Sequence, residues 1–200
     1  MAISEPTSDG RSARTHRTRD AVVESLLAWL RDGNLRPTAK DIAERAGISV
    51  RSVYVHFDDL DDLFCAASEH QGALVADLVR EIPATGSFDE RLTAVVEQRI
   101  RVFEAILPVQ RAAALQEPFS PTLQTILRTM RDYQRSEIER VFAAELDRVP
   151  PVTRSAVLDA AHLVAVEESW AQLRGPHGLD VARSRTALET ALRALLGAQA

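Results

Sequence analysis

The chain has 200 residues, of which 46% are hydrophobic, 26% charged and 5% aromatic. This is enough apolar material for one large or two small domains with genuine cores, it favours helices over sheets, and it excludes a wholly disordered chain. No run of about 18 apolar residues and no apolar leader occurs, which predicts a soluble, cytoplasmic protein without a membrane partner. The single cysteine, Cys65, cannot form an internal disulfide, and no Cys/His cluster has zinc-site spacing, so we expect neither a metal nor a cofactor.

The net charge of −5 is unevenly distributed along the chain. Residues 1–57 carry a net +2, and the remainder carries −7. Within the first segment, basic residues without an intervening acid are Arg11, Arg14, His16, Arg17 and Arg19. This run suits a phosphate backbone, although a basic tail with no partner is the alternative.

Apolar residues recur at helical spacing almost everywhere, which predicts an all-α fold. A first helix is expected from near Thr18 to the Gly33 stop. Pro37 and Thr38 then open a second, short helix, which Gly47 closes.

Ser49 is a good N-cap for a third short helix over Val50–Phe57. A connecting helix follows, from near Leu60 to about Arg80. Further helices are expected, separated mainly by prolines and glycines, over 88–107, 109–116, 121–148, 153–173 and 180–196.

Two short helices joined by Gly47-Ile48-Ser49, after a longer helix, match the helix-turn-helix pattern. At 100° per residue, the side chains on the inner side of the third helix are Val50, Val53, Tyr54 and Phe57. Those that point outward are Arg51, Ser52 and Val55. This helix is expected in the major groove of DNA.

The outward side chains have the chemistry to read bases. Arg51 can donate two hydrogen bonds to guanine, Ser52 can bond a base or a phosphate, and Val55 suits a thymine methyl group. Helix-terminus donors and charge at Ser49, and at Thr38 with Lys40, are expected to hold phosphates.

The segment from Arg36 to Phe57, followed by Leu63-Phe64, resembles the N-terminal DNA-binding domain of the TetR family of bacterial transcriptional regulators. The resemblance covers residues 18–64 and rests on Thr38, Ile42-Ala43, Ala46-Gly47-Ile48-Ser49, Tyr54 and His56-Phe57. It implies a homodimer that binds a short palindromic operator and a C-terminal domain whose small-molecule effector releases the DNA. It also implies that Tyr54 and His56 contact phosphates. The expected DNA-binding set is Thr38, Lys40, Ser49, Val50, Arg51, Ser52, Tyr54, Val55 and His56.

The sequence departs from the family pattern at two positions. Arg51 stands where the family often has glycine, and Leu60 stands where it often has lysine. Around Leu60 lie four acids, which we interpret as helix caps with a cation site as the alternative: Asp58, Asp59, Asp61 and Asp62. Because these acids repel a duplex, we hypothesise that the basic arm supplies compensating charge. A helical ligand-binding or interaction module that has lost DNA binding is the competing interpretation.

The expected organisation is a flexible basic arm (1–17), a three-helix DNA-binding domain (18–64) and a larger helical domain for effector binding and dimerisation (65–200). Small residues along 153–173 and 180–196 resemble the helix pair that forms the family's dimer bundle, and an intramolecular core is the alternative.

An effector pocket is expected between the helices 88–107 and 121–148. Its expected walls are Phe103, Leu107, Phe119, Leu123, Leu127, Met130 and Tyr133, with polar or aromatic contacts from Gln134, His162, Glu167 and Trp170. His162 near Asp159 is a weaker candidate for a metal ligand or base. An enzyme is not expected, because no G-x-S-x-G, H-E-x-x-H or glycine-rich phosphate loop is present.

Overall fold

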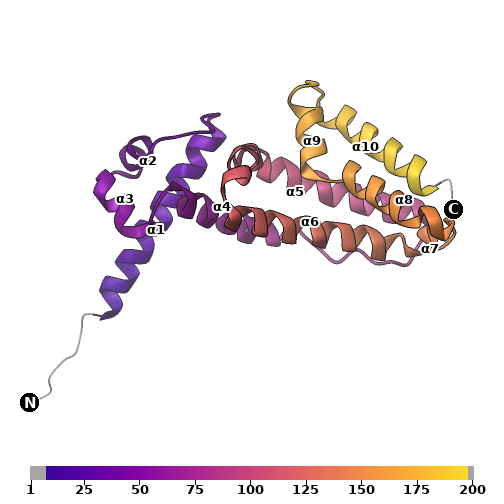
Figure 1. The fold of residues 1–200 in the computed structure, drawn as a ribbon, viewed down its shortest axis with the longest axis horizontal. Helices are drawn as coiled ribbons and strands as arrows, with labels where there is room; N and C mark the ends of the chain where they lie inside the picture. The colour runs from indigo at the N-terminus through magenta and orange to yellow at the C-terminus, as the bar shows by residue number, and fades with distance from the viewer. Residues whose placement is uncertain (1–7, 198–200) are drawn as a thin grey trace, which may run out of the picture.

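The computed structural model describes residues 8–197, with side chains from residue 12 onward. This range is all-α, as predicted, and contains no strand. Figure 1 shows an elongated molecule with a small helical head at one end. The helices are α1 (Ser8–Arg31), α2 (Ala39–Ala46), α3 (Val50–His56), α4 (Leu60–Ala76), α5 (Phe88–Gln116), α6 (Pro121–Val141), α7 (Ala143–Leu146), α8 (Pro151–Val164), α9 (Glu167–Arg174) and α10 (Val181–Leu196), with a 3₁₀ turn, η1 (Glu117–Phe119), between α5 and α6.

The head is built from α1, α2 and α3 around one apolar core. Leu26 and Leu27 of α1, Ile42 of α2, and Val53 and Phe57 of the α3 segment are all at most 1% exposed. The amphipathic spacing of these residues places one face of each helix against the other two. Burial of this shared face holds the three helices together.

The core of the head continues into α4 and α5 without a break. Leu63 and Phe64 belong to it, as do Ala67 further along α4 and Val109 and Ala112 of α5. The expected domain boundary at residue 64 therefore falls inside a continuous helix, and α4 is common to both parts of the molecule.

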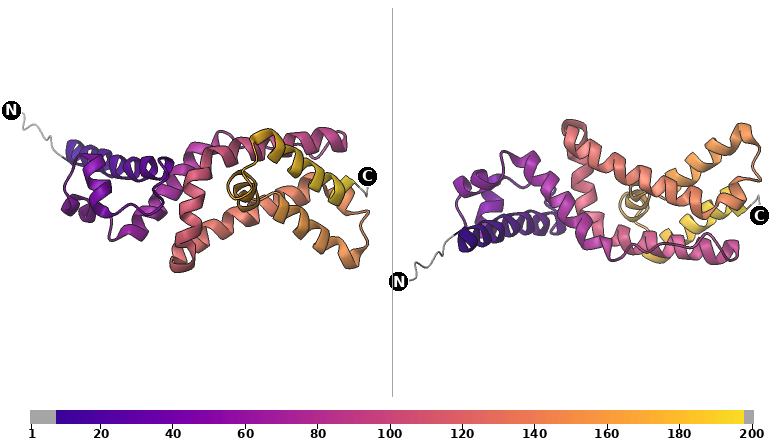
Figure 2. Two further views of the ribbon diagram at one scale, coloured as in Figure 1. Left: turned by 90° about the horizontal axis from the view of Figure 1, so that it is seen from above. Right: turned by 90° about the horizontal axis from the view of Figure 1, so that it is seen from below.

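The C-terminal domain surrounds the long helix α5. Figure 2 shows α5 and α6 diverging along the domain, with α8, α9 and α10 completing it on the side away from the head. α5 packs against α4, α9 and α10, and α8 packs against α6 and α10. The main core of this domain includes Leu92, Ile138, Phe142, Leu158 and Leu192.

The expected start and end points are wrong for several helices. Residues 8–17, expected in a flexible arm, continue α1 as helix, while residues 1–7 lie outside the described range. Thr18 does not cap α1, because its hydroxyl donates to the Arg14 carbonyl one turn earlier at 3.0 Å. The connecting helix ends at Ala76 rather than near Arg80.

Three further differences lie in the C-terminal domain. Pro108 does not end its helix, because Ile106 and Val109 are buried on either side of it and α5 continues to Gln116. The helix expected over 121–148 is interrupted at Phe142, and the one expected over 153–173 is interrupted after Val164. Tertiary packing overrides local signals at these positions.

A buried ion pair fastens α5 to the α6–α7 corner. Arg91 donates from Nη1 to Glu145 Oε2 at 2.9 Å and from Nη2 to Oε1 at 2.6 Å, and it also donates to the Val141 carbonyl. Both side chains are at most 6% exposed. Hydrogen bonding to Arg91 holds the pKa of Glu145 below its usual value, against the opposing effect of burial.

Breaking this pair from one side is expected to destabilise the protein strongly. Arg91→Met leaves Glu145 buried without its partner, and we expect the free energy of unfolding to fall by about 3–5 kcal/mol. Urea unfolding followed by circular dichroism measures it. The double variant Arg91→Met/Glu145→Leu is the control and should recover most of the loss; a double variant as unstable as the single one would contradict the argument.

Candidate nucleic-acid interface and effector cavity

α2 begins at a reciprocal capping box and ends at a glycine that starts the turn to α3. Thr38 accepts a hydrogen bond from the Asp41 backbone N–H at 3.2 Å, while the Asp41 carboxylate accepts from the Thr38 backbone N–H at 2.8 Å. Gly47 ends α2 with φ +68°, a left-handed conformation that favours glycine. The N–H of Ile48 then closes the turn on the Ala43 carbonyl at 3.0 Å.

α3 begins at the Ser49 cap and presents a polar outer face. The Ser49 hydroxyl oxygen accepts from the Ser52 backbone N–H at 3.1 Å, and the two hydroxyls lie 2.9 Å apart. Val53 and Phe57 are buried, as predicted, whereas Val55 is 71% exposed and Arg51 is exposed. The predicted outward orientation of Arg51 and Val55 therefore agrees with the structure, and Ser52 is half-buried.

Two residues expected on the inner side of α3 lie at the surface instead. Val50 is 39% exposed and Tyr54 is 50% exposed. A helix of only seven residues packs through a narrow stripe, here Val53 and Phe57, so residues flanking that stripe remain open to solvent. This correction adds Val50 and Tyr54 to the accessible face.

Polar and basic groups extend the face around α3. Thr38 and Lys40 at the start of α2 are exposed, and His56 is half-buried. Arg14 and Arg17 are exposed near the N-terminal end of α1, which projects beyond α3 in Figure 1. The guanidinium of Arg19 lies 4.8 Å from the centre of the Phe57 ring, so the two helices meet through a cation–π contact.

The acids after α3 act within the fold as caps. Asp59 accepts from the Asp62 N–H at 2.9 Å, and Asp62 accepts from the Asp58 N–H at 3.3 Å. Asp61 accepts from the Ser120 hydroxyl at 2.8 Å. Among the described residues no group of three or more metal-ligating side chains is present, here or elsewhere.

A groove of about 770 Å³ separates the head from the C-terminal domain. Its walls include Lys40 and Tyr54 from the head, and Leu115 and Phe119 from the end of α5 and η1. Phe119 is 79% exposed and lines this groove rather than the interior. It lies in a 3₁₀ turn that faces the head rather than the interior.

The interior between α4, α5 and α6 holds a cavity of only about 40 Å³. Leu127 and Met130 line it, as expected of pocket residues. Its other lining residues come from α4, α5 and the start of α9: Ser68, Gln71, Gly72, Val75, Ile106, Val109, Gln110, Ala113 and Glu167.

The other expected pocket residues do not line this cavity. Phe103, Leu123 and Trp170 are at most 1% exposed and belong to the packed core. Leu107 and His162 are half-buried. Tyr133 of α6 is 54% exposed.

Two carboxylates make long-range contacts in this region. Glu104 accepts from the Trp170 indole N–H at 2.7 Å and from Arg174 at 2.8 Å, so it fixes α9 against α5. Glu168 pairs with Arg131. No local pattern in the sequence signals these contacts, because each joins residues more than 30 positions apart.

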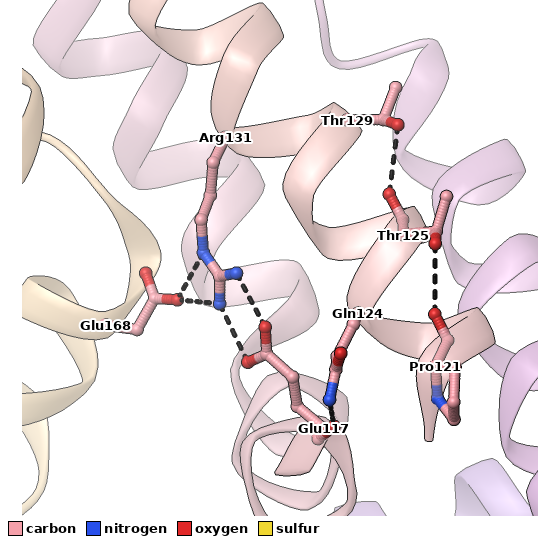
Figure 3. Close-up of polar contacts among 7 residues, drawn as sticks. All are labelled: Glu117, Pro121, Gln124, Thr125, Thr129, Arg131 and Glu168. Carbon is pink, nitrogen blue, oxygen red and sulfur yellow. Dashed lines mark hydrogen bonds and ion pairs between the residues drawn. The ribbon is translucent and has the colours of Figure 1, made fainter. Parts of the chain in front are cut away.

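Arg131 connects three elements around the cavity, as Figure 3 shows. Its guanidinium donates to both carboxylate oxygens of Glu117 in η1, at 2.7 and 2.9 Å, and to Glu168 of α9 at 2.8 Å. Hydrogen bonding to Arg131 lowers the pKa of Glu117. η1 in turn contacts the start of α4 through Ser120 and Asp61.

Residues 33–67, which contain this helix-turn-helix, match the model of the bacterial regulatory proteins of the tetR family. These residues form a DNA-binding segment of the tetR type. The resemblance noted in the sequence is thereby confirmed. No curated protein matches the chain in sequence. Within residues 8–197, no helix combines the length and the apolar character that crossing a bilayer requires.

Solved structures with the same fold include a transcriptional regulator, a TetR transcription regulator and a complex of SmeT with triclosan. A transcriptional regulator from Rhodococcus sp. Rha1 is 15% identical, with a TM-score of 0.67 over 90% of this chain and 96% of that one. A TetR transcription regulator from Haloarcula marismortui ATCC 43049 is 16% identical, with a TM-score of 0.66 over 92% and 98%. SmeT in complex with triclosan is 17% identical, with a TM-score of 0.61 over 91% of each chain. At these identities the likeness shows that the fold extends over nearly the whole chain.

The Gly47 turn offers a test of the interface geometry. Gly47→Ala places a Cβ on a backbone with φ +68°, and we expect the free energy of unfolding to fall by about 1–2 kcal/mol. Gly72→Ala, inside α4 where a Cβ meets no atom within 4 Å, is the matched control and should raise it by about 0.5–1 kcal/mol. Urea midpoints measure both; equal effects of the two substitutions would contradict the assigned turn.

Proposed function

We propose that this TetR-family protein is a dimeric repressor that binds a palindromic operator through α3 and is released by a small-molecule effector. It acts in the cytoplasm, where its DNA partner lies, and it is a binding protein rather than an enzyme. The observation that carries the proposal is the outer face of α3, where Arg51 and Val55 are exposed while Val53 and Phe57 anchor the helix.

The exposed face of the head supports a division of labour on DNA. Arg51 has the fork of donors that reads guanine, and Val55 is an apolar contact for a thymine methyl group. Thr38, Lys40, Tyr54 and the other accessible residues around α3, namely Ser49, Val50, Ser52 and His56, are proposed to hold the backbone or neighbouring bases. In this scheme the basic residues of α1, including Arg14 and Arg17, supply positive charge that compensates for the capping acids.

Dimerisation is proposed through the outer faces of α8 and α10. The small and apolar residues of these two helices have two kinds of position. Leu158 and Leu188 are buried in the core of the single chain, whereas Ala187 and Ala191 line a groove along α10. Leu163 on α8 is 67% exposed, an unusual position for a leucine on a protein that functions alone. A two-fold pair of heads is what a palindromic site requires.

Coupling between effector and DNA is proposed through α4 and the Arg131 contacts. α4 carries Leu63 in the core of the head and Val75 in the wall of the cavity, so an expansion of the cavity displaces a helix that the head depends on. Arg131 joins Glu168 beside the cavity to η1, and Ser120 joins η1 to Asp61. Allostery requires such a shared element, whose position both sites bias.

An operator-binding assay can distinguish a residue that reads bases from a residue that binds phosphates. A duplex selected from a random library by the full-length protein should be palindromic and should bind in a mobility-shift assay. Arg51→Ala should cost about 1–3 kcal/mol and relax preference at one position of each half-site, whereas Lys40→Ala should weaken all sequences alike and lower the salt slope by about one. An Arg51→Ala protein with unchanged base preference would remove it from the reading role. Failure to select any duplex would favour the module that has lost DNA binding.

The dimer is tested by its mass in solution. Wild-type protein should sediment as a dimer at micromolar concentration. Leu163→Arg and Thr190→Arg introduce charge on the exposed faces of α8 and α10, and each should shift the equilibrium towards monomer without lowering the melting temperature of the monomer. Leu74→Arg, at an exposed position of α4, is the control and should remain dimeric. A monomeric wild type, or dimers that tolerate both arginines, would exclude this interface.

A further inference from the structure

The cavity has mainly aliphatic walls, and Glu167 is the single charged residue among those that line it. Glu167 is 3% exposed and lines the cavity, and most of the other walls are aliphatic, including Val75, Ile106, Leu127 and Met130. Glu167 accepts one hydrogen bond, from the Gln134 side-chain amide at 2.9 Å. Among the described residues no lysine, arginine or histidine forms an ion pair with it.

The groups beside Glu167 have an excess of hydrogen-bond acceptors. Gln134 Oε1 and Glu168 Oε2 are fully buried and accept no hydrogen bond. The buried Nε2 of His162 also has no hydrogen-bond partner. Unpaired buried polar atoms are costly and rare in native proteins. Of these side chains Glu167 lines the cavity, so it is the acceptor that a hydrogen-bond donor of a ligand meets.

The neighbouring cations already have partners. Arg99 lies 2.8 Å from Glu137 and donates to the Gln134 carbonyl, although its Nε makes no hydrogen bond. Arg131 is shared between Glu117 and Glu168. The ionisable groups named here comprise four carboxyl groups and two guanidinium groups, so the carboxyl groups are in excess: Glu117, Glu137, Glu167, Glu168, Arg99 and Arg131. Burial raises the pKa of Glu167, and the nearby carboxylate of Glu168 raises it further. Glu167 lacks an ion-pair partner, so a cationic ligand would supply the opposite charge. An anionic ligand would instead be repelled by Glu167, with no free cation nearby to balance the two charges.

We propose that the effector is a lipophilic monocation with N–H donors, such as an alkylamine on an apolar body, whose charged end binds Glu167. This inference rests on the proposed effector release and names the chemistry of that effector. The apolar part of the effector is proposed to bind between α4, α5 and α6. The space there is only about 40 Å³ in this structure, which is too small for it. Binding therefore requires α4 to move outward near Gly72 and Val75.

The test compares three probes with one hydrocarbon and different heads: 4-phenylbutylamine, 4-phenylbutan-1-ol and 4-phenylbutanoate. Each is titrated calorimetrically into the full-length dimer without DNA. The amine should bind at least about tenfold more tightly than the alcohol, and the carboxylate should not bind. Equal binding of amine and alcohol, preference for the carboxylate, or no binding of any probe would overturn the proposal.

Two variants assign the preference to Glu167. Glu167→Gln should reduce the amine's affinity by at least about tenfold and remove its advantage over the alcohol. Glu69→Gln, an exposed carboxylate on α4, is the matched control and should bind all three probes as the wild type does. An unchanged amine preference in Glu167→Gln overturns the assignment. The wild-type probe series decides the ligand class even where that variant does not fold.

A mobility-shift assay with and without the amine keeps the two proposals distinguishable. Amine-specific binding together with release of operator DNA supports both. Amine-specific binding in a protein that does not bind DNA supports the cation site while rejecting the repressor. Operator binding without amine-specific binding rejects the cation site while leaving the repressor in place.

Discussion

The structure depends on one helix that belongs to two cores. The first half of α4 contributes Leu63 and Phe64 to the packing of the head, and its second half contributes Val75 to the wall of the interior cavity. Because protein cores are close-packed, a helix shared in this way cannot shift at one end without altering the packing at the other. The orientation of α3 is therefore tied to the state of the C-terminal domain by ordinary van der Waals contact, and the ion pairs of Arg131 reinforce the same connection from η1.

The head was more predictable from the sequence than the C-terminal domain, for physical reasons. The capping pair Thr38–Asp41, the left-handed Gly47 and the Ser49 cap are local devices whose partners lie within four residues, so their spacing alone predicts the structure. Burial of Val53 and Phe57 followed from helical periodicity. The positions of Val50 and Tyr54 did not, because periodicity gives the direction of a side chain but not the width of the surface that covers it.

In the C-terminal domain, the decisive contacts are non-local. The helix break at Ala165–Val166 has no glycine or proline to signal it, yet it turns Glu167 towards the cavity and brings Trp170 against Phe103, with ring centres 6.5 Å apart. Pro108 shows the converse, since a strong local stop signal is overridden by burial on both sides. Candidate pocket residues chosen by residue type therefore divided among core, surface and cavity, and only Leu127, Met130 and Glu167 line the observed space.

The small size of the cavity has a thermodynamic consequence for regulation. A ligand shifts an equilibrium only by the difference between its affinities for the two states. A cavity of about 40 Å³ excludes any ligand of drug size, so in the proposed mechanism such a ligand binds only a conformation in which α4 has moved. Its whole binding free energy then favours that conformation, because it does not bind the other one. The closed state meanwhile retains a buried, unpaired carboxylate, which raises its free energy and lowers the energy needed to open it. If the proposed cation binds there, the same residue that destabilises the empty state stabilises the occupied one, which is the property that a switch requires.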